Sequence, residues 1–215
     1  MNKQDTHRRA FLVRVAAGAV AGAGVAPDAS AQGRAPDVHQ HSSQGAFFNQ
    51  QDAATVAALA ERIMPGAPGK PGAKDAGVVN YIDLALSGAY ADLQDFYRRG
   101  LAQLDGFCQR TYHEAFRRLD AARQDEVIAA LEQGRATGFD WPPAEEFFTT
   151  LRTHTMEGMF ADPIYGGNHD FAGWRLVGFP GAQAIFTPPD MQSKEAFTRA
   201  GMVGLQAAEV PKRKG

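Results

Sequence analysis

Apolar residues recur every three or four positions in five stretches of the chain, which is the spacing of one face of an α-helix. In the first stretch, Val56, Leu59 and Ile63 fall on one face and follow a possible N-cap at Asn49. The predicted helices run from about residue 50 to 64, 78 to 86, 93 to 108 and 120 to 134, and from Pro142-Pro143 to at least Met159. No alternating strand pattern of useful length accompanies them. The pattern predicts an all-α fold, an irregular bundle of about five helices.

The pattern changes in the segment DPIYGGNHDFAGWRLVGFPG, from Asp162 to Gly181. This segment holds five glycines and two prolines, yet it keeps large apolar side chains such as Tyr165, Trp174 and Phe179. Its composition predicts an irregular, Gly- and aromatic-rich segment after the bundle. Two uses of the apolar side chains remain open. They could anchor a partner protein, or they could cap the bundle of this chain.

Residues 1–31 have the features of an export signal. Two arginines precede x-Phe-Leu, as in the twin-arginine signal, and a weakly apolar run leads to small residues in the A-x-A arrangement of a cleavage site. The residues assigned are Arg8, Arg9, Phe11 and Leu12 for recognition, and Ala29 and Ala31 for cleavage. An ordinary secretory signal is the alternative. Because the twin-arginine route carries folded proteins, we expect a loaded cofactor or a bound partner at export.

Three regions follow this leader: a polar linker over residues 32–46, a helical domain over 47–181 and an extended tail over 182–215. We expect the tail to be loosely ordered, or ordered only against something else. The formal net charge is −2 for the whole chain and −4 without the leader, and no basic stripe is present. Nucleic-acid binding needs clustered Lys and Arg, so the charge pattern argues against it.

The sequence offers little material for catalysis. The single cysteine, Cys108, falls on a predicted apolar helix face, which favours a buried free thiol over a bridge to a partner. His154-x-x-Glu157 is the strongest candidate metal motif, with Asp162 and His169 nearby, but only one copy occurs. The other interpretation is that His154 and Glu157 are locally hydrogen-bonded residues on a helix rim. We therefore expect no catalytic, cofactor-binding or metal-binding residue in this chain.

Three parts of the chain together resemble a known family. They are the leader, FFNQQDAATVAALAERIMPGAPGKPGAKDAGVVNYIDLAL, and FFTTLRTHTMEGMFADPIYGGN with the GW and GFPG that follow it. They look like the gluconate 2-dehydrogenase subunit 3 family over roughly residues 47–181. The most specific positions lie in the third part: Asp162, Pro163, Tyr165, Gly166, Gly167, Asn168, Gly173, Trp174, Gly178, Phe179 and Pro180.

The resemblance implies a periplasmic complex of three subunits at the inner membrane. A large flavoprotein holds FAD and oxidises a sugar, sugar acid or polyol, and a multi-haem cytochrome c passes the electrons to ubiquinone. The small subunit has no cofactor; it carries the leader that the flavoprotein lacks, and it escorts that partner through the twin-arginine translocase. The expected interface residues are Tyr165, Gly166, Gly167, Asn168, Trp174, Phe179 and Pro180. An independent metal- or haem-binding oxidoreductase is the alternative function.

Overall fold

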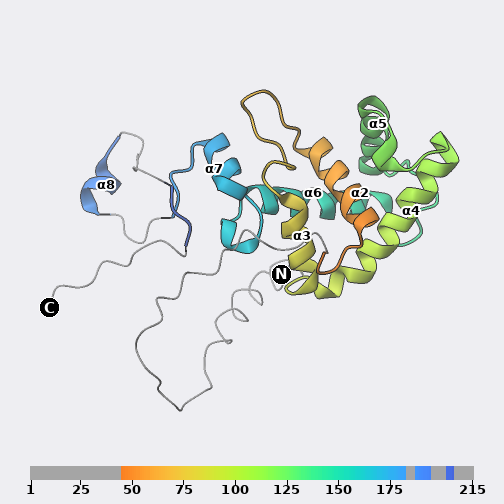
Figure 1. The fold of residues 1–215 in the computed structure, drawn as a ribbon, viewed down its shortest axis with the longest axis horizontal. Helices are drawn as coiled ribbons and strands as arrows, with labels where there is room; N and C mark the ends of the chain where they lie inside the picture. Colours follow the sequence, from red (N-terminus) through yellow and green to blue (C-terminus); the bar gives the residue numbers. More distant parts are fainter. Residues whose placement is uncertain (1–44, 183–186, 195–201, 206–215) are drawn as a thin grey trace, which may run out of the picture. The chain divides into compact units, whose positions relative to one another are not determined.

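The computed structural model describes residues 45–182, 187–194 and 202–205. Its described part is built from helices and contains no strand, so the all-α prediction is confirmed there (Figure 1). The α-helices are α2 (Gln50–Ile63), α3 (Val78–Ser87), α4 (Gln94–Tyr112), α5 (Ala121–Glu132), α6 (Ala144–Phe160), α7 (Ala172–Val177) and α8 (Pro188–Gln192). Short 3₁₀ turns join them: η1 (Ala91–Leu93), η2 (Phe116–Arg118), η3 (Pro163–Tyr165) and η4 (His169–Phe171).

The helix ends follow local chemistry. The Asn49 side chain accepts hydrogen bonds from the backbone N–H groups of Gln51 and Asp52, both at 2.9 Å, which confirms the predicted cap of α2. The predicted start of α6 was two residues early, because Pro143 keeps an extended backbone and serves as the N-cap of a helix that begins at Ala144. Helix α4 continues past the predicted end and stops where His113 takes a left-handed φ of 56°.

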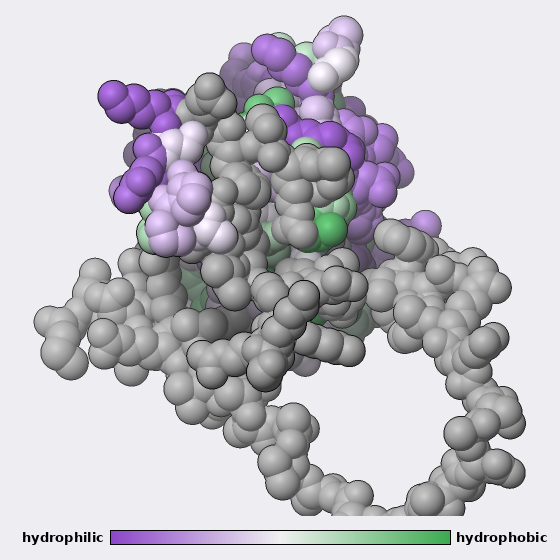
Figure 2. Space-filling model, turned by 90° about the vertical axis from the view of Figure 1, so that its left-hand side faces the viewer, coloured by the Kyte–Doolittle hydropathy of each residue, from purple (hydrophilic) through white to green (hydrophobic). Residues whose placement is uncertain are grey.

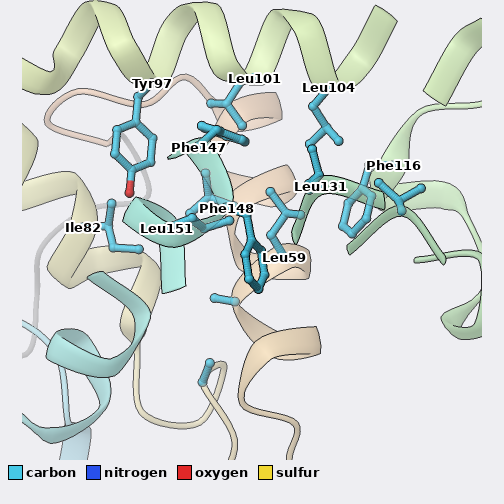
Figure 3. Packing of buried hydrophobic residues seen from close by; sticks show 14 of the residues in the cluster. Leu59, Ile82, Tyr97, Leu101, Leu104, Phe116, Leu131, Phe147, Phe148 and Leu151 are labelled. Atoms are coloured by element: carbon cyan, nitrogen blue, oxygen red, sulfur yellow. The ribbon is translucent and has the colours of Figure 1, made fainter. Parts of the chain in front are cut away.

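Helix α6 provides the centre of the bundle, because it packs against α2, α3, α4 and α5. Phe147 and Leu151 on its inner face are fully buried. In Figure 3 the side chains of α4 and α2 surround this part of α6. Gly100 of α4 lies directly against the Phe147 ring, so that a methyl group at Gly100 would overlap the ring. A glycine in the middle of a helix therefore makes room for a fully buried ring of α6.

A buried carboxylate fixes the start of the domain. Asp83, on α3, accepts hydrogen bonds from the backbone N–H groups of Ala46, Phe47 (2.9 Å) and Phe48 (2.6 Å). The Phe48 ring is buried in the core. A buried charge needs such donors to offset its lost hydration. Asp83 thus sets the point at which the chain enters the bundle, a role that was not predicted from the sequence.

Candidate partner-binding surface

The chain that leaves α6 is shaped by one buried side chain, Asn168. Its amide nitrogen donates to the carbonyl of Ala161 (2.9 Å), and its amide oxygen accepts from the Gly173 N–H (2.8 Å). Its backbone N–H donates to the carbonyl of Gly158 (2.8 Å). Asn168 is completely buried. These three bonds tie both η4 and α7 to the last turn of α6, so Asn168 serves the fold of this chain.

Glycines allow this segment to lie against α6. A Cβ atom at Gly167 would overlap the carbonyl of Gly158, and one at Gly173 would overlap the carbonyl of Met159. Gly166 has a φ of 90°, in the region that favours glycine. Helix α7 therefore packs backbone to backbone on the end of α6, which no larger residue at 167 or 173 would permit.

The turn between η3 and α7 contains an unusual run of left-handed residues. Asn168, Asp170 and Phe171 have φ values of 49°, 51° and 57°. Such non-glycine residues cost on the order of 1–3 kcal/mol each and persist only where their surroundings impose them. The His169 N–H, which donates to the carbonyl of Ala76 (3.1 Å), and the bonds of Asn168 provide that restraint.

Trp174 packs inside this chain. Only 6% of the residue is exposed, and its indole N–H donates to the carbonyl of Phe160 (2.8 Å). Its ring stacks on Phe171 at 5.3 Å between centroids and meets Phe179 edge-on at 4.8 Å. It also lies on α7, a short regular helix in the middle of a segment that we predicted to be irregular. In this structure, Trp174 therefore caps the bundle of its own chain.

The other predicted interface residues differ in how far they are buried. Gly166, Gly167 and Asn168 are buried, Tyr165 and Pro180 are half-buried, and Phe179 is 43% exposed. Three further apolar side chains of the segment are exposed but were not among the predicted interface residues: Ile164, Leu176 and Val177. Val177 is 62% exposed, and its neighbour Leu176 is also exposed. We call Ile164, Leu176, Val177 and Phe179 the apolar rim; they lie on or beside η3 and α7.

A groove opens beside this rim. It is lined by Phe160, Trp174, Val177 and Phe179 and has a volume of about 370 Å³. Figure 2 looks at the side of the molecule that lies at the left of Figure 1, and small areas of hydrophobic surface are visible there beside hydrophilic ones. All four lining side chains are apolar, so the groove suits an apolar side chain of a partner better than a charged ligand.

A polar cluster lies where His154 and Glu157 of α6 face three tyrosines. The Tyr97 hydroxyl is 2.8 Å from His154 Nδ1, and the Tyr90 ring stacks on the imidazole at 4.6 Å. The hydroxyls of Tyr81 and Tyr90 each donate to Glu157 Oε2 at 3.1 Å. Burial lowers the pKa of His154 from 6.5 to about 4, so the imidazole is neutral at pH 7. The prediction that His154 and Glu157 bond locally on a helix rim was wrong, because their partners come from α3, α4 and the loop between them.

The candidate metal ligands do not converge. Nowhere in the described residues do three or more His, Cys, Asp or Glu side chains gather in a way that could hold a metal ion. His154 faces Tyr97, whereas the ring of His169 lies against Gly77. Asp162 caps η3 by accepting the Ile164 N–H at 3.0 Å.

Cys108 is a buried free thiol, as the helix pattern predicted. Burial, together with the nearby charge of Asp105, raises its pKa to about 12. The thiol is therefore protonated at pH 7 and inaccessible to a partner in the folded domain.

Several predictions lie outside the described residues. They are the export residues Arg8, Arg9, Phe11 and Leu12, the cleavage residues Ala29 and Ala31, and nearly all of the linker. Among the described helices, none combines the length and the apolar character needed to cross a bilayer.

Comparison with known proteins addresses the identity of the chain. No curated protein and no solved structure matches the sequence. The family described as Gluconate 2-dehydrogenase subunit 3 matches residues 50–181, from the first residue of α2 to the end of the segment that follows α7. The match contains both the bundle and the Asn168-centred turn. This chain belongs to the gluconate 2-dehydrogenase subunit 3 family.

Proposed function

We propose that this chain is the non-catalytic small subunit of a periplasmic FAD-dependent dehydrogenase complex, which it joins as export escort and structural partner of the flavoprotein subunit. Membership of the subunit 3 family carries the proposal, since the family implies a subunit of a dehydrogenase complex. FAD and haem c belong, in this proposal, to the flavoprotein and to a cytochrome subunit. In this proposal the chain is associated with the inner membrane through the complex.

The apolar rim supports the assignment of a protein partner. Five of the nine exposed large apolar side chains of the described residues lie on α3, α6, η3 and α7, of which α3 packs against α6 and η3, and α6 packs against α7. Such surface is costly in a soluble protein unless something covers it. Obligate interfaces are rich in apolar and aromatic anchors, and Phe179 and Val177 next to the groove fit this description.

An affinity measurement tests the interface. Phe179→Asp places a charge at the groove and should weaken binding to the flavoprotein subunit by roughly thirtyfold or more. Trp141→Asp is the matched control, because Trp141 is also an exposed aromatic residue but lies before α6 and away from α7 in the sequence. Equal binding by wild type and Phe179→Asp, measured by titration calorimetry, would exclude the apolar rim as the anchor.

The escort role is tested through export. Changing Arg8 and Arg9 together to Lys should keep the chain in the cytoplasm, because Lys lacks the fork geometry of the guanidinium group. Arg14→Lys, in the same leader but outside the pair, is the control. We expect dehydrogenase activity to disappear from the periplasm only in the double variant. Normal periplasmic activity in that strain would show that the flavoprotein does not depend on this leader.

A further inference from the structure

Four residues of the C-terminal tail return to the domain. Residues 202–205 lie beyond the family match, which ends at 181. The Leu205 N–H donates to Asp162 Oδ2 at 2.7 Å, and the Ala182 N–H donates to the carbonyl of Val203 at 2.8 Å. Val203 and Leu205 are thus both bonded to the domain. We call residues 202–205 the strap.

Asp162 is built to receive this strap. Only 9% of the residue is exposed, so its carboxylate needs donors in place of water. Its Oδ1 accepts the N–H of Ile164, within the same turn, and its Oδ2 accepts the N–H of Leu205, which is 43 residues away. Gly204 lies flat against the carboxylate, where a Cβ atom would be 3.0 Å from Oδ1. At the other contact Gly181 has a φ of 96°, and a Cβ there would be 2.9 Å from the Val203 nitrogen.

The strap is held by backbone hydrogen bonds more than by apolar burial. The side chain of Leu205 remains largely exposed, and Val203 is only half-buried. A hydrogen bond to a charged acceptor shifts an equilibrium by roughly 10- to 100-fold. That is enough to keep the strap in place in a free subunit, yet much less than the affinity of an extensive apolar interface.

The strap also contacts the chain next to both ends of the apolar rim. Asp162 directly precedes η3 with Ile164, and the Gly181–Ala182 contact follows Phe179 by two residues. A partner that covers the apolar rim from Ile164 to Phe179 therefore meets the strap. On the basis of the proposed function, we propose that the strap is an intramolecular ligand of Asp162 at the edge of this surface, where it leaves the apolar rim exposed. The flavoprotein subunit displaces it and supplies its own N–H donor to Asp162 Oδ2.

Two variants of Leu205 separate the effect of its backbone hydrogen bond to Asp162 from the effect of its side chain. Leu205→Pro removes the N–H that donates to Asp162, whereas Leu205→Ala keeps it and changes only an exposed side chain. Asp162 and its bond to Ile164 remain intact in both variants. The first measurement is hydrogen exchange of the Ala182 amide in the full mature chain without a partner. We expect this amide to exchange about tenfold faster or more in Leu205→Pro than in wild type, and at the wild-type rate in Leu205→Ala.

The second measurement is the affinity of each variant for the flavoprotein subunit. Displacement predicts about tenfold tighter binding by Leu205→Pro and no change for Leu205→Ala. Unchanged Ala182 exchange in Leu205→Pro would show that this bond does not hold the strap. Weaker binding by Leu205→Pro with normal Leu205→Ala would make the strap a part of the interface and overturn displacement. If wild type does not bind the flavoprotein, the proposed function and displacement both fail, while the exchange data still decide whether the strap is docked by Asp162.

Discussion

The bundle of α2 to α6 and the segment from Asp162 to Gly181 are stabilised in different ways. In the bundle, large apolar side chains such as Phe147 and Leu151 fill the space between helices. In the segment, the backbone itself packs on α6, through Gly167 and Gly173, and one amide side chain, Asn168, closes the turn. Most large apolar side chains of the bundle are buried, with exceptions such as Leu84 and Met156, while the segment leaves all four side chains of the apolar rim exposed. A region with a shape fixed by backbone contacts can offer its side chains to a partner.

The largest effect should follow from emptying the bundle core. Phe147→Ala removes a fully buried ring from between α6 and α4 and should lower the free energy of unfolding by about 3–5 kcal/mol. Urea unfolding followed by circular dichroism measures this loss. Phe179→Ala is the matched control, because the same ring is deleted at a 43% exposed site, and we expect it to cost about 1 kcal/mol or less. Equal losses would remove the distinction between bundle and segment.

A second effect comes from pH. The folded domain holds His154 neutral, with a pKa of about 4, whereas an unfolded chain protonates it near 6.5. The unfolded state therefore binds the proton more readily, so this contribution to stability is complete above pH 6.5 and is lost as the pH falls towards 4. The expected loss is about 3 kcal/mol between pH 7 and pH 4.

A variant separates this histidine from the carboxylates that titrate in the same range. In His154→Gln the amide oxygen can still accept from the Tyr97 hydroxyl, but the side chain does not titrate. Unfolding free energies of both proteins across this pH range should converge at the acidic end. Parallel curves would mean that His154 is not buried as a neutral group.

The bundle could be predicted from the sequence, because the 3.6-residue periodicity of side chains such as Val56 and Leu59 records which face is buried. The segment could be located but not interpreted. A high glycine content predicts that the segment is not a regular helix. It does not tell whether a given glycine, such as Gly173, is needed for a turn or for close packing against another helix. The same limit applied to Trp174, which is buried and donates its indole N–H to the carbonyl of Phe160, 14 residues earlier in the chain. Asp83 and Asp162 were missed as anchors because their donors are backbone groups 35 to 43 residues away.

A smaller and strictly local effect should follow from opening the turn at Asn168. Asn168→Ala removes both side-chain bonds and leaves the buried Gly173 N–H without an acceptor, which should cost about 1–3 kcal/mol in the stability of the α7 segment. Trp174 reports the change, since its indole would gain water contact and its fluorescence maximum would move to longer wavelength. Asn168→Asp keeps the acceptor for Gly173 but loses the donor to Ala161, so we expect an intermediate shift.

Cys108 shows whether this opening stays local. Its thiol is fully buried in α4, and its pKa of about 12 keeps it protonated, so a thiol reagent reaches it only when the bundle unfolds. We expect Asn168→Ala to leave the labelling rate of Cys108 at the wild-type value, while Phe147→Ala accelerates it by roughly 100-fold or more under fast-reclosing conditions. If Asn168→Ala also accelerates labelling, the turn and the bundle unfold as one unit. The segment after α6 would then be part of the cooperative core, and its exposed apolar rim would lie on a surface as rigid as the bundle itself.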